Sequence, residues 1–204
     1  LDETVYNLKA VPTYRSGIVD SCLLILHDWS SFISCEDDEI DKERGVILEE
    51  WRTRNTSDRR LWKKSSSILY EGSQYAKRDI IGDTAIILNF HPDSLRAYYN
   101  KWYRPDLQGI IIVGDVDVDY VENKIKEIFA DIPARVNPAT RVVYDLKKLD
   151  TTKVCILTDP EAKYTMGNIT YRHDAMSSEV YASIVGYSTS VIDNLISKMV
   201  NARI

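Results

Sequence analysis

Apolar residues recur at the spacing of an α-helix along much of the chain. The clearest case lies between about Ser16, which can cap a helix, and Ile33; its apolar face is wide enough to predict a helix buried on most of its circumference. Similar spacing, preceded by acidic residues or by proline, predicts further helices. Their approximate ranges are Asp38–Arg54, Asp58–Tyr70, Pro92–Tyr103 and Val118–Phe129, and a last helix runs from about Ser177 to the end.

Other stretches have the pattern of β-strands. Thr4–Val11 alternates, is rich in β-branched residues and stops at a proline, whereas Leu107–Val113 is the continuous apolar run of a buried strand. Two more strands are predicted over Lys153–Thr158 and Thr165–Arg172. Because strands and helices are unevenly interspersed, the pattern favours an α+β fold over a doubly wound parallel sheet.

One segment has the composition of a linker. The stretch IPARVNPATR contains two prolines and few apolar residues, so we expect it to separate two domains. The chain opens within a predicted strand and closes within a predicted helix, whereas natural termini usually fray into polar residues. We therefore expect a piece cut from a longer protein.

Composition narrows the class of protein. The 204 residues are 44% hydrophobic and 28% charged, which excludes a disordered or low-complexity chain. The net charge of -5 speaks against a nucleic-acid partner, and no apolar run approaches the ~18 residues of a membrane span. Three cysteines cannot complete a disulfide framework, and the three histidines, His27, His91 and His173, stand far apart.

Two carboxylates on the second predicted helix are candidates for chemistry. Glu43 and Glu50 are seven residues apart, so they lie within roughly 20° of each other on the helix, on a stripe that also carries large apolar residues. A carboxylate on the core side is destabilising unless a cation, a metal or hydrogen-bond donors meet it. An ion pair with Arg44 or Arg54 is the commoner explanation of such spacing, and a metal site is the alternative.

Two longer blocks carry a resemblance to a known family. These are ERGVILEE, residues 43–50, and FHPDSLRAYYNKWYRPDLQGIIIVGDVDVDYVENKIKEIFADIP, residues 90–133. Together they resemble the M16 zinc metallopeptidases (the insulinase, pitrilysin and mitochondrial processing peptidase group) over about residues 1–135, and more loosely beyond. The resemblance implies an α+β fold with a mixed, largely antiparallel sheet layered with helices, as in the LuxS and processing-peptidase-like metallohydrolases.

The resemblance also implies roles for both glutamates. Family members hold zinc through an H-x-x-E-H helix and a later glutamate; on this pattern Glu50 is the zinc ligand and Glu43 a carboxylate that supports the site. No H-x-x-E-H motif occurs in the sequence, so the two histidines and the catalytic base are expected upstream of Leu1. We therefore expect no catalytic residue in this chain, no zinc bound to it alone, and no activity without the rest of the parent metalloendopeptidase.

Domains and partners follow from the same resemblance. Residues 1–135 would form an incomplete peptidase-type domain lacking its first strands and zinc helix, residues 136–147 the linker, and residues 148–204 the truncated start of a second such domain. The expected partners are a peptide or unfolded protein substrate and a second M16-type half, in the same chain or another subunit, with no nucleic acid. The compartment stays open between a cytoplasmic and a periplasmic location for a soluble protein.

Two other classes of protein remain as alternatives. The parent protein could be a non-catalytic homologue that binds substrate or assists assembly, or the chain could be an α+β interaction domain whose glutamates form an ion-pair network. The remaining candidates have structural explanations: His27 lies in a buried helix, and His91 precedes a helix start. The run Asp115, Asp117 and Asp119 lacks the glycine and glutamate of a calcium loop, and we expect it to start the following helix.

Overall fold

The computed structural model describes residues 2–144, 146, 149–172 and 176–203. The described chain divides into two compact units, Leu1–Arg59 with Arg78–Val143, and Arg60–Lys77 with Tyr144–Ile204. His173, part of the predicted linker (145 and 147) and the predicted domain start at 148 lie outside the described residues. The predicted domain boundaries stay a prediction.

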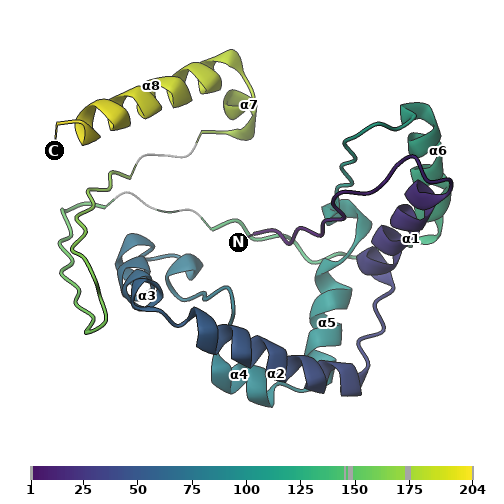
Figure 1. Cartoon of the computed structure of the whole chain (residues 1–204), viewed down its shortest axis with the longest axis horizontal. Helices are drawn as coiled ribbons and strands as arrows, with labels where there is room; N and C mark the ends of the chain where they lie inside the picture. Colours follow the sequence, from purple (N-terminus) through teal and green to yellow (C-terminus); the bar gives the residue numbers. More distant parts are fainter. Residues whose placement is uncertain (1, 145, 147–148, 173–175, 204) are drawn as a thin grey trace. The chain divides into compact units, whose positions relative to one another are not determined.

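The first unit consists of helices joined by irregular segments (Figure 1). Its elements are α1 (Ile18–Ser31), α2 (Asp37–Arg54), the start of α3 (Ser57–Leu69), α4 (Thr84–Asn89), α5 (Pro92–Trp102), η2 (Pro105–Leu107), α6 (Val118–Ile128) and η3 (Phe129–Asp131). All five helices predicted for the first 131 residues are confirmed to within about two residues at each end. The short helix α4 was not predicted.

Side chains at the helix starts explain these bounds. Asp117 Oδ1 accepts a hydrogen bond from the Tyr120 amide at 2.9 Å and Asp119 lies in the first turn, so the predicted role in starting α6 is confirmed for these two aspartates. His91 accepts from the amide of Asp93 at 3.3 Å and precedes Pro92 at the first position of α5, as expected from the sequence. Such caps satisfy amides that have no partner inside the helix.

The predicted sheet is wrong for the part of the chain that the structure describes. None of residues 2–144, 146, 149–172 and 176–203 belongs to a β-strand, so the α+β fold with a layered antiparallel sheet is not what the residues form. An apolar strand pattern predicts an extended backbone. A β-strand, however, forms only where a second segment pairs with it through a ladder of hydrogen bonds. Ile111 and Val113 lie in the segment predicted as a buried strand, and they are 88% and 92% exposed.

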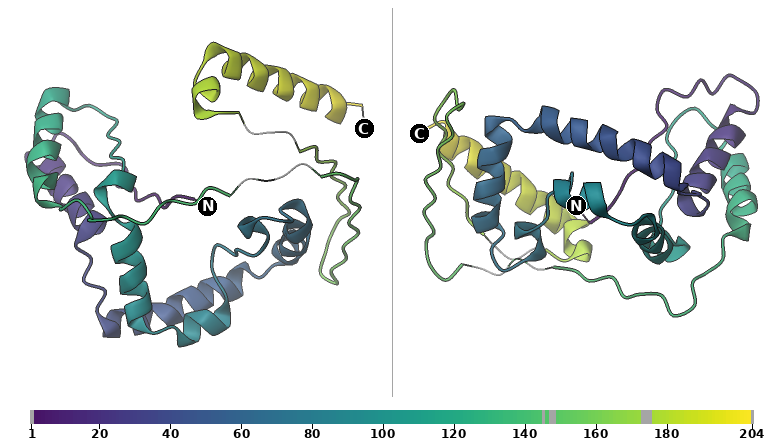
Figure 2. Two further views of the ribbon diagram at one scale, coloured as in Figure 1. Left: turned by 180° about the vertical axis from the view of Figure 1, so that it is seen from behind. Right: turned by 90° about the horizontal axis from the view of Figure 1, so that it is seen from below.

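One part of the core of the first unit lies between α1 and α6, which run side by side (Figure 2). Leu23 on α1 and Val121 on α6 are buried there. The Tyr99 hydroxyl, from α5, donates to the Trp29 carbonyl at 2.9 Å, which joins α5 to the end of α1. Tyr99 of α5 is therefore buried against a helix.

The second unit contains most of α3, η1 (Gln74–Ala76), α7 (Ser178–Tyr181) and α8 (Ile184–Asn201). Arg60 at the start of α3 forms two hydrogen bonds to the Asp159 carboxylate, at 2.7 and 2.8 Å, and Arg172 donates to the carbonyl of Leu69 at the end of that helix. The predicted terminal helix is divided in two, because Ser183 interrupts it and caps α8 through the Gly186 amide.

No helix within the described ranges is long and apolar enough to cross a membrane.

Candidate metal centre

Both candidate glutamates lie on α2, a helix whose charged residues are distributed so that they stabilise it. Three acidic residues, Asp37, Asp38 and Glu39, occupy its first turn, and Arg52 and Arg54 its last. Each sign of charge thus lies at the end of the helix dipole that it stabilises. The Arg52 hydrogen bond to Glu49, at 2.5 Å, lowers the pKa of that carboxyl.

The structure exposes Glu43 and Glu50 at the margin of the packed face of α2. Ile40 is buried and Ile47 half-buried, and each glutamate follows one of them by three residues, so it is turned about 60° from their line. The carboxylates were predicted on the apolar side of the helix, and this rotation is what brings them to solvent. The two side chains therefore leave α2 on a common side, two turns apart.

Glu50 has an arginine partner at the surface. Its Oε1 lies 2.8 Å from Nη2 of Arg54, one turn later, and the two side chains are 44% and 63% exposed. Exposed pairs of this kind contribute little to stability, so the pair leaves the carboxylate available to another cation.

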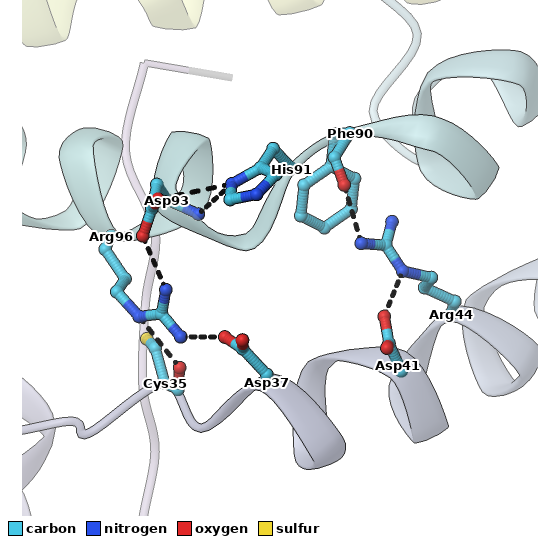
Figure 3. A network of polar contacts seen from close by, with 8 residues as sticks. All are labelled: Cys35, Asp37, Asp41, Arg44, Phe90, His91, Asp93 and Arg96. Carbon is cyan, nitrogen blue, oxygen red and sulfur yellow. Dashed lines mark hydrogen bonds and ion pairs between the residues drawn. The ribbon is translucent and has the colours of Figure 1, made fainter.

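Arg44, the other arginine considered from the sequence, has different partners (Figure 3). Its guanidinium donates to the main-chain carbonyls of Ile87 at 2.5 Å and Phe90 at 2.6 Å, where α4 ends. It lies 3.9 Å from the centre of the Phe90 ring and pairs with Asp41 at 2.8 Å. A cation at the end of a helix satisfies carbonyls that have no partner inside it.

A second arginine attaches the first turn of α2 to α5. Arg96 donates to the carbonyl of Cys35 at 3.1 Å, to Asp93 at 2.7 Å and to Asp37 (Figure 3). Arg44 connects the two blocks that carry the family resemblance, because it belongs to ERGVILEE and donates to Phe90 at the start of FHPDSLR. Arg96 joins the second block to Cys35 and Asp37, which precede the first.

Neither of these roles was predicted from the sequence. The one signal for them in the sequence is the position of Arg44 on the same helical stripe as Ile40, Ile47 and Trp51. Main-chain carbonyls as acceptors leave no mark in a sequence, and α4, which provides them, was not predicted.

The described part of the chain contains no group of three or more His, Cys, Asp and Glu side chains that could hold a metal ion. His27 contacts Asp28 and Asp131, whereas His91 is exposed at the start of α5. An exposed carboxylate such as Glu50 is suited to give zinc one oxygen ligand. Glu50 thus fits zinc as one ligand of a site, and the described residues do not form a complete site.

Comparison with known proteins defines the class. The family model described as the peptidase M16 inactive domain matches residues 89–190, half of the chain. The chain belongs to the peptidase M16 family, and the family recognised from the sequence is confirmed.

Particular relatives are named as proteases. The probable zinc protease PqqL of Haemophilus influenzae is 26% identical over the whole chain, and that of Escherichia coli is 30% identical over 84% of it. These alignments cover 22% and 18% of the relatives, so the chain spans about a fifth of their length.

Two solved structures are similar to this one. The first half of the periplasmic protease PqqL from Escherichia coli has a TM-score of 0.62 and 30% identity, covering 67% of this chain and 29% of that one. A mutant of the ferredoxin protease FusC, solved in complex with Arabidopsis ferredoxin, has a TM-score of 0.63 and 26% identity, covering 69% of this chain and 16% of that one. The relatives' names thus support a peptidase for the parent protein.

Proposed function

We propose that this chain is part of a zinc metalloendopeptidase and that Glu50 is one of its zinc ligands. The observation that carries the proposal is the placement of α2. The face of α2 that carries Arg44 is occupied by α4, while Glu43 and Glu50 leave the helix together on a side where both are exposed to solvent. The names of the relatives, zinc proteases, support zinc as the metal.

Each glutamate has a separate role in this proposal. Glu50 would hold the metal through a carboxylate oxygen, and Glu43, two turns earlier, would orient a ligating side chain by accepting its hydrogen bond. Zinc, when bound, polarises the scissile carbonyl and lowers the pKa of a water molecule towards 7. The remaining ligands and the general base would come from outside these 204 residues, so the chain alone would not hydrolyse peptides.

The domain organisation and partners form part of the same proposal. Residues 1–135 would belong to one peptidase-type domain and residues 148–204 to the next, with residues 136–147 between them. The substrate would be a peptide or an unfolded protein, enclosed with the help of a second M16-type half. The similarity to a structure described as the first half of PqqL supports a protein built from two halves, and its description as periplasmic favours that compartment.

The test uses the full-length protein and an unstructured peptide. Glu50→Gln keeps the size of the side chain but removes its charge, so we expect peptide cleavage to fall by about tenfold or more, alongside a loss of zinc. Glu49→Gln is the matched control, because Glu49 lies on another side of α2 and pairs with Arg52. Full activity of the Glu50→Gln protein, or activity that survives a zinc chelator, would contradict the proposal.

A second function is favoured by one observation. The matched family model is described as an inactive domain and covers residues 89–190, which leaves α2 outside the match. A parent protein that only binds substrate would retain peptides without cleaving them, and Glu50→Gln would then leave peptide binding unchanged.

A further inference from the structure

The contact between α2 and α4 depends on one charged side chain among apolar ones. The face of α2 that meets α4 carries Ile40, Ile47 and Trp51, which are buried or half-buried, and Arg44 lies on the same face. The Arg44 side chain is only 13% exposed. A guanidinium removed from water in this way is stable only where its donors are satisfied.

Those donors are satisfied by the end of α4. The carbonyls of Ile87 and Phe90 accept from different nitrogens, Nη1 and Nη2, and Nε donates to Asp41 one turn earlier on α2. The Phe90 ring covers the guanidinium plane at 3.9 Å. Acceptors for three nitrogens and a stacked ring leave the guanidinium a single orientation, so the contact fixes how α2 is rotated about its own axis (Figure 3).

That rotation determines where Glu43 and Glu50 point. Both side chains leave α2 beside the face that Arg44 attaches to α4, and Glu43 is its neighbour in the chain. Binding sites work only when their groups are held within about 10–20° of the productive geometry. A looser rotation of α2 would therefore weaken a metal site that uses Glu50 without removing any ligand.

We propose that Arg44 is a positioning residue for the metal site: by joining α2 to the carbonyl end of α4 it fixes the direction in which Glu50 meets zinc. The inference rests on the proposed function, since it needs Glu50 to be a ligand. Arg96 holds the first turn of α2 to α5 in a similar way, but its partner Asp37 is thirteen residues from Glu50, whereas Arg44 is six residues away.

The experiment measures zinc affinity of the full-length protein by competition with a chromophoric chelator. In Arg44→Met we expect the zinc dissociation constant to rise by about tenfold or more, as for other groups that orient metal ligands. Arg44→Lys should behave similarly, because an ammonium cannot reproduce the planar fork and the stacked contact. Arg52→Met, which removes an exposed arginine paired with Glu49 on the same helix, should stay within about twofold of the wild type.

A second readout separates positioning from general stability. In zinc-free protein, Arg44→Met should speed hydrogen exchange in α2 and in residues 84–90, while α6 keeps its protection. A purely structural role would lower the melting temperature but leave the zinc affinity of the folded protein unchanged, and that result overturns the proposal. If Arg44→Met does not fold, Phe90→Leu replaces it in the experiment. Loss of the stacked ring should weaken zinc binding by about threefold. Unchanged zinc affinity in this variant counts against the proposal.

The failure of the two proposals can be told apart. Unchanged zinc affinity in Glu50→Gln contradicts the proposed function itself. Weaker zinc binding in Glu50→Gln, with wild-type binding in Arg44→Met, overturns only the role of Arg44.

Discussion

His27 lies between two carboxylates near the end of α1. Its Nε2 is 2.9 Å from Asp131 and its Nδ1 3.1 Å from Asp28, and the ring stacks on Phe32. Burial opposes protonation of the imidazole, but the hydrogen bonds and charges of the two aspartates outweigh it and raise the pKa of His27. The two aspartates thus favour the protonated imidazole, and the contact with Asp131 links α1 to η3, consistent with the structural role expected from the sequence.

This contact makes stability depend on pH. Because the folded state holds the proton more tightly, the stabilisation is complete below the unfolded pKa of about 6.5 and is lost as the pH rises through the folded value. In urea unfolding, His27→Gln should therefore have a lower free energy of unfolding than the wild type, and the difference should be largest near about pH 6 and smaller at higher pH. The exposed His91, changed to Gln, serves as the control. A deficit that does not change with pH would mean that the ring stabilises only by packing.

At the scale of elements, α4 is the helix on which the placement of α2 depends. Asp83 caps it by accepting from the amides of Ala85 at 2.8 Å and Ile86 at 3.3 Å. α4 is six residues long, which is too short to be stable without its cap and its contact with α2.

Removal of this cap should loosen α4 locally. In Asp83→Ala we expect the local stability of α4 to fall by about 1 kcal/mol. Hydrogen exchange of residues 85–90 should be correspondingly faster, by about fivefold. Asp115→Ala removes an exposed aspartate elsewhere in the same unit and should leave these amides unchanged. Equal protection of residues 85–90 in the Asp83→Ala protein and the wild type would show that tertiary contacts alone hold α4.

The turn between α7 and α8 depends on a glycine. A Cβ atom on Gly186 would lie 2.3 Å from the Val180 carbonyl oxygen and 2.6 Å from that of Tyr181, both of which belong to the main chain. We expect Gly186→Ala to separate α7 from α8 and to destabilise their contact by about 1–3 kcal/mol. Gly167→Ala is the control, since nothing lies within 4 Å of the added atom. Unfolding curves of the two variants that coincide would contradict this account of the turn.

Helices could be predicted from this sequence because their determinants are local. The apolar spacing of Val118–Ile128 and its cap Asp117 lie within a dozen residues. The extended segments, such as the one containing Ile111, were predicted equally clearly, but a sheet needs partner segments that a local pattern does not identify. For the same reason Glu43 and Glu50 could be found as a pair, whereas the attachment of α2 through Arg44 depends on α4, a helix too short to leave a periodic pattern.

At the scale of the whole molecule, the second unit depends on a buried carboxylate. The Asp159 side chain is 5% exposed and forms hydrogen bonds with Arg60 and the Glu161 amide, which together lower the pKa of Asp159 to about 2. A second carboxylate, Glu161, lies 2.7 Å from the same guanidinium. These contacts connect α3 to residues about a hundred positions later in the chain.

Acid should weaken the contact between α3 and residues 159–161. Because the pKa is lower in the folded state, the stabilisation is present above the unfolded value of about 4 and is lost as the pH falls towards 2. Hydrogen exchange of residues 61–69, corrected for its intrinsic pH dependence, should therefore lose protection between about pH 4.5 and 2.5. In Asp159→Asn the protection should already be low at about pH 4.5, whereas Asp150→Asn should behave as the wild type. Full protection of Asp159→Asn at that pH would contradict this role.

The PqqL relatives are about five times longer than this chain. The most direct test of the zinc proposal therefore uses the full-length protein to which this chain belongs. The measurement is an anomalous difference map from crystals of the full-length protein, collected on both sides of the zinc absorption edge. The account predicts a zinc peak about 2.0–2.2 Å from a carboxylate oxygen of Glu50, with Glu43 beside it but not bound to the metal. A zinc peak elsewhere in the protein, with Glu50 still paired to Arg54, would contradict it.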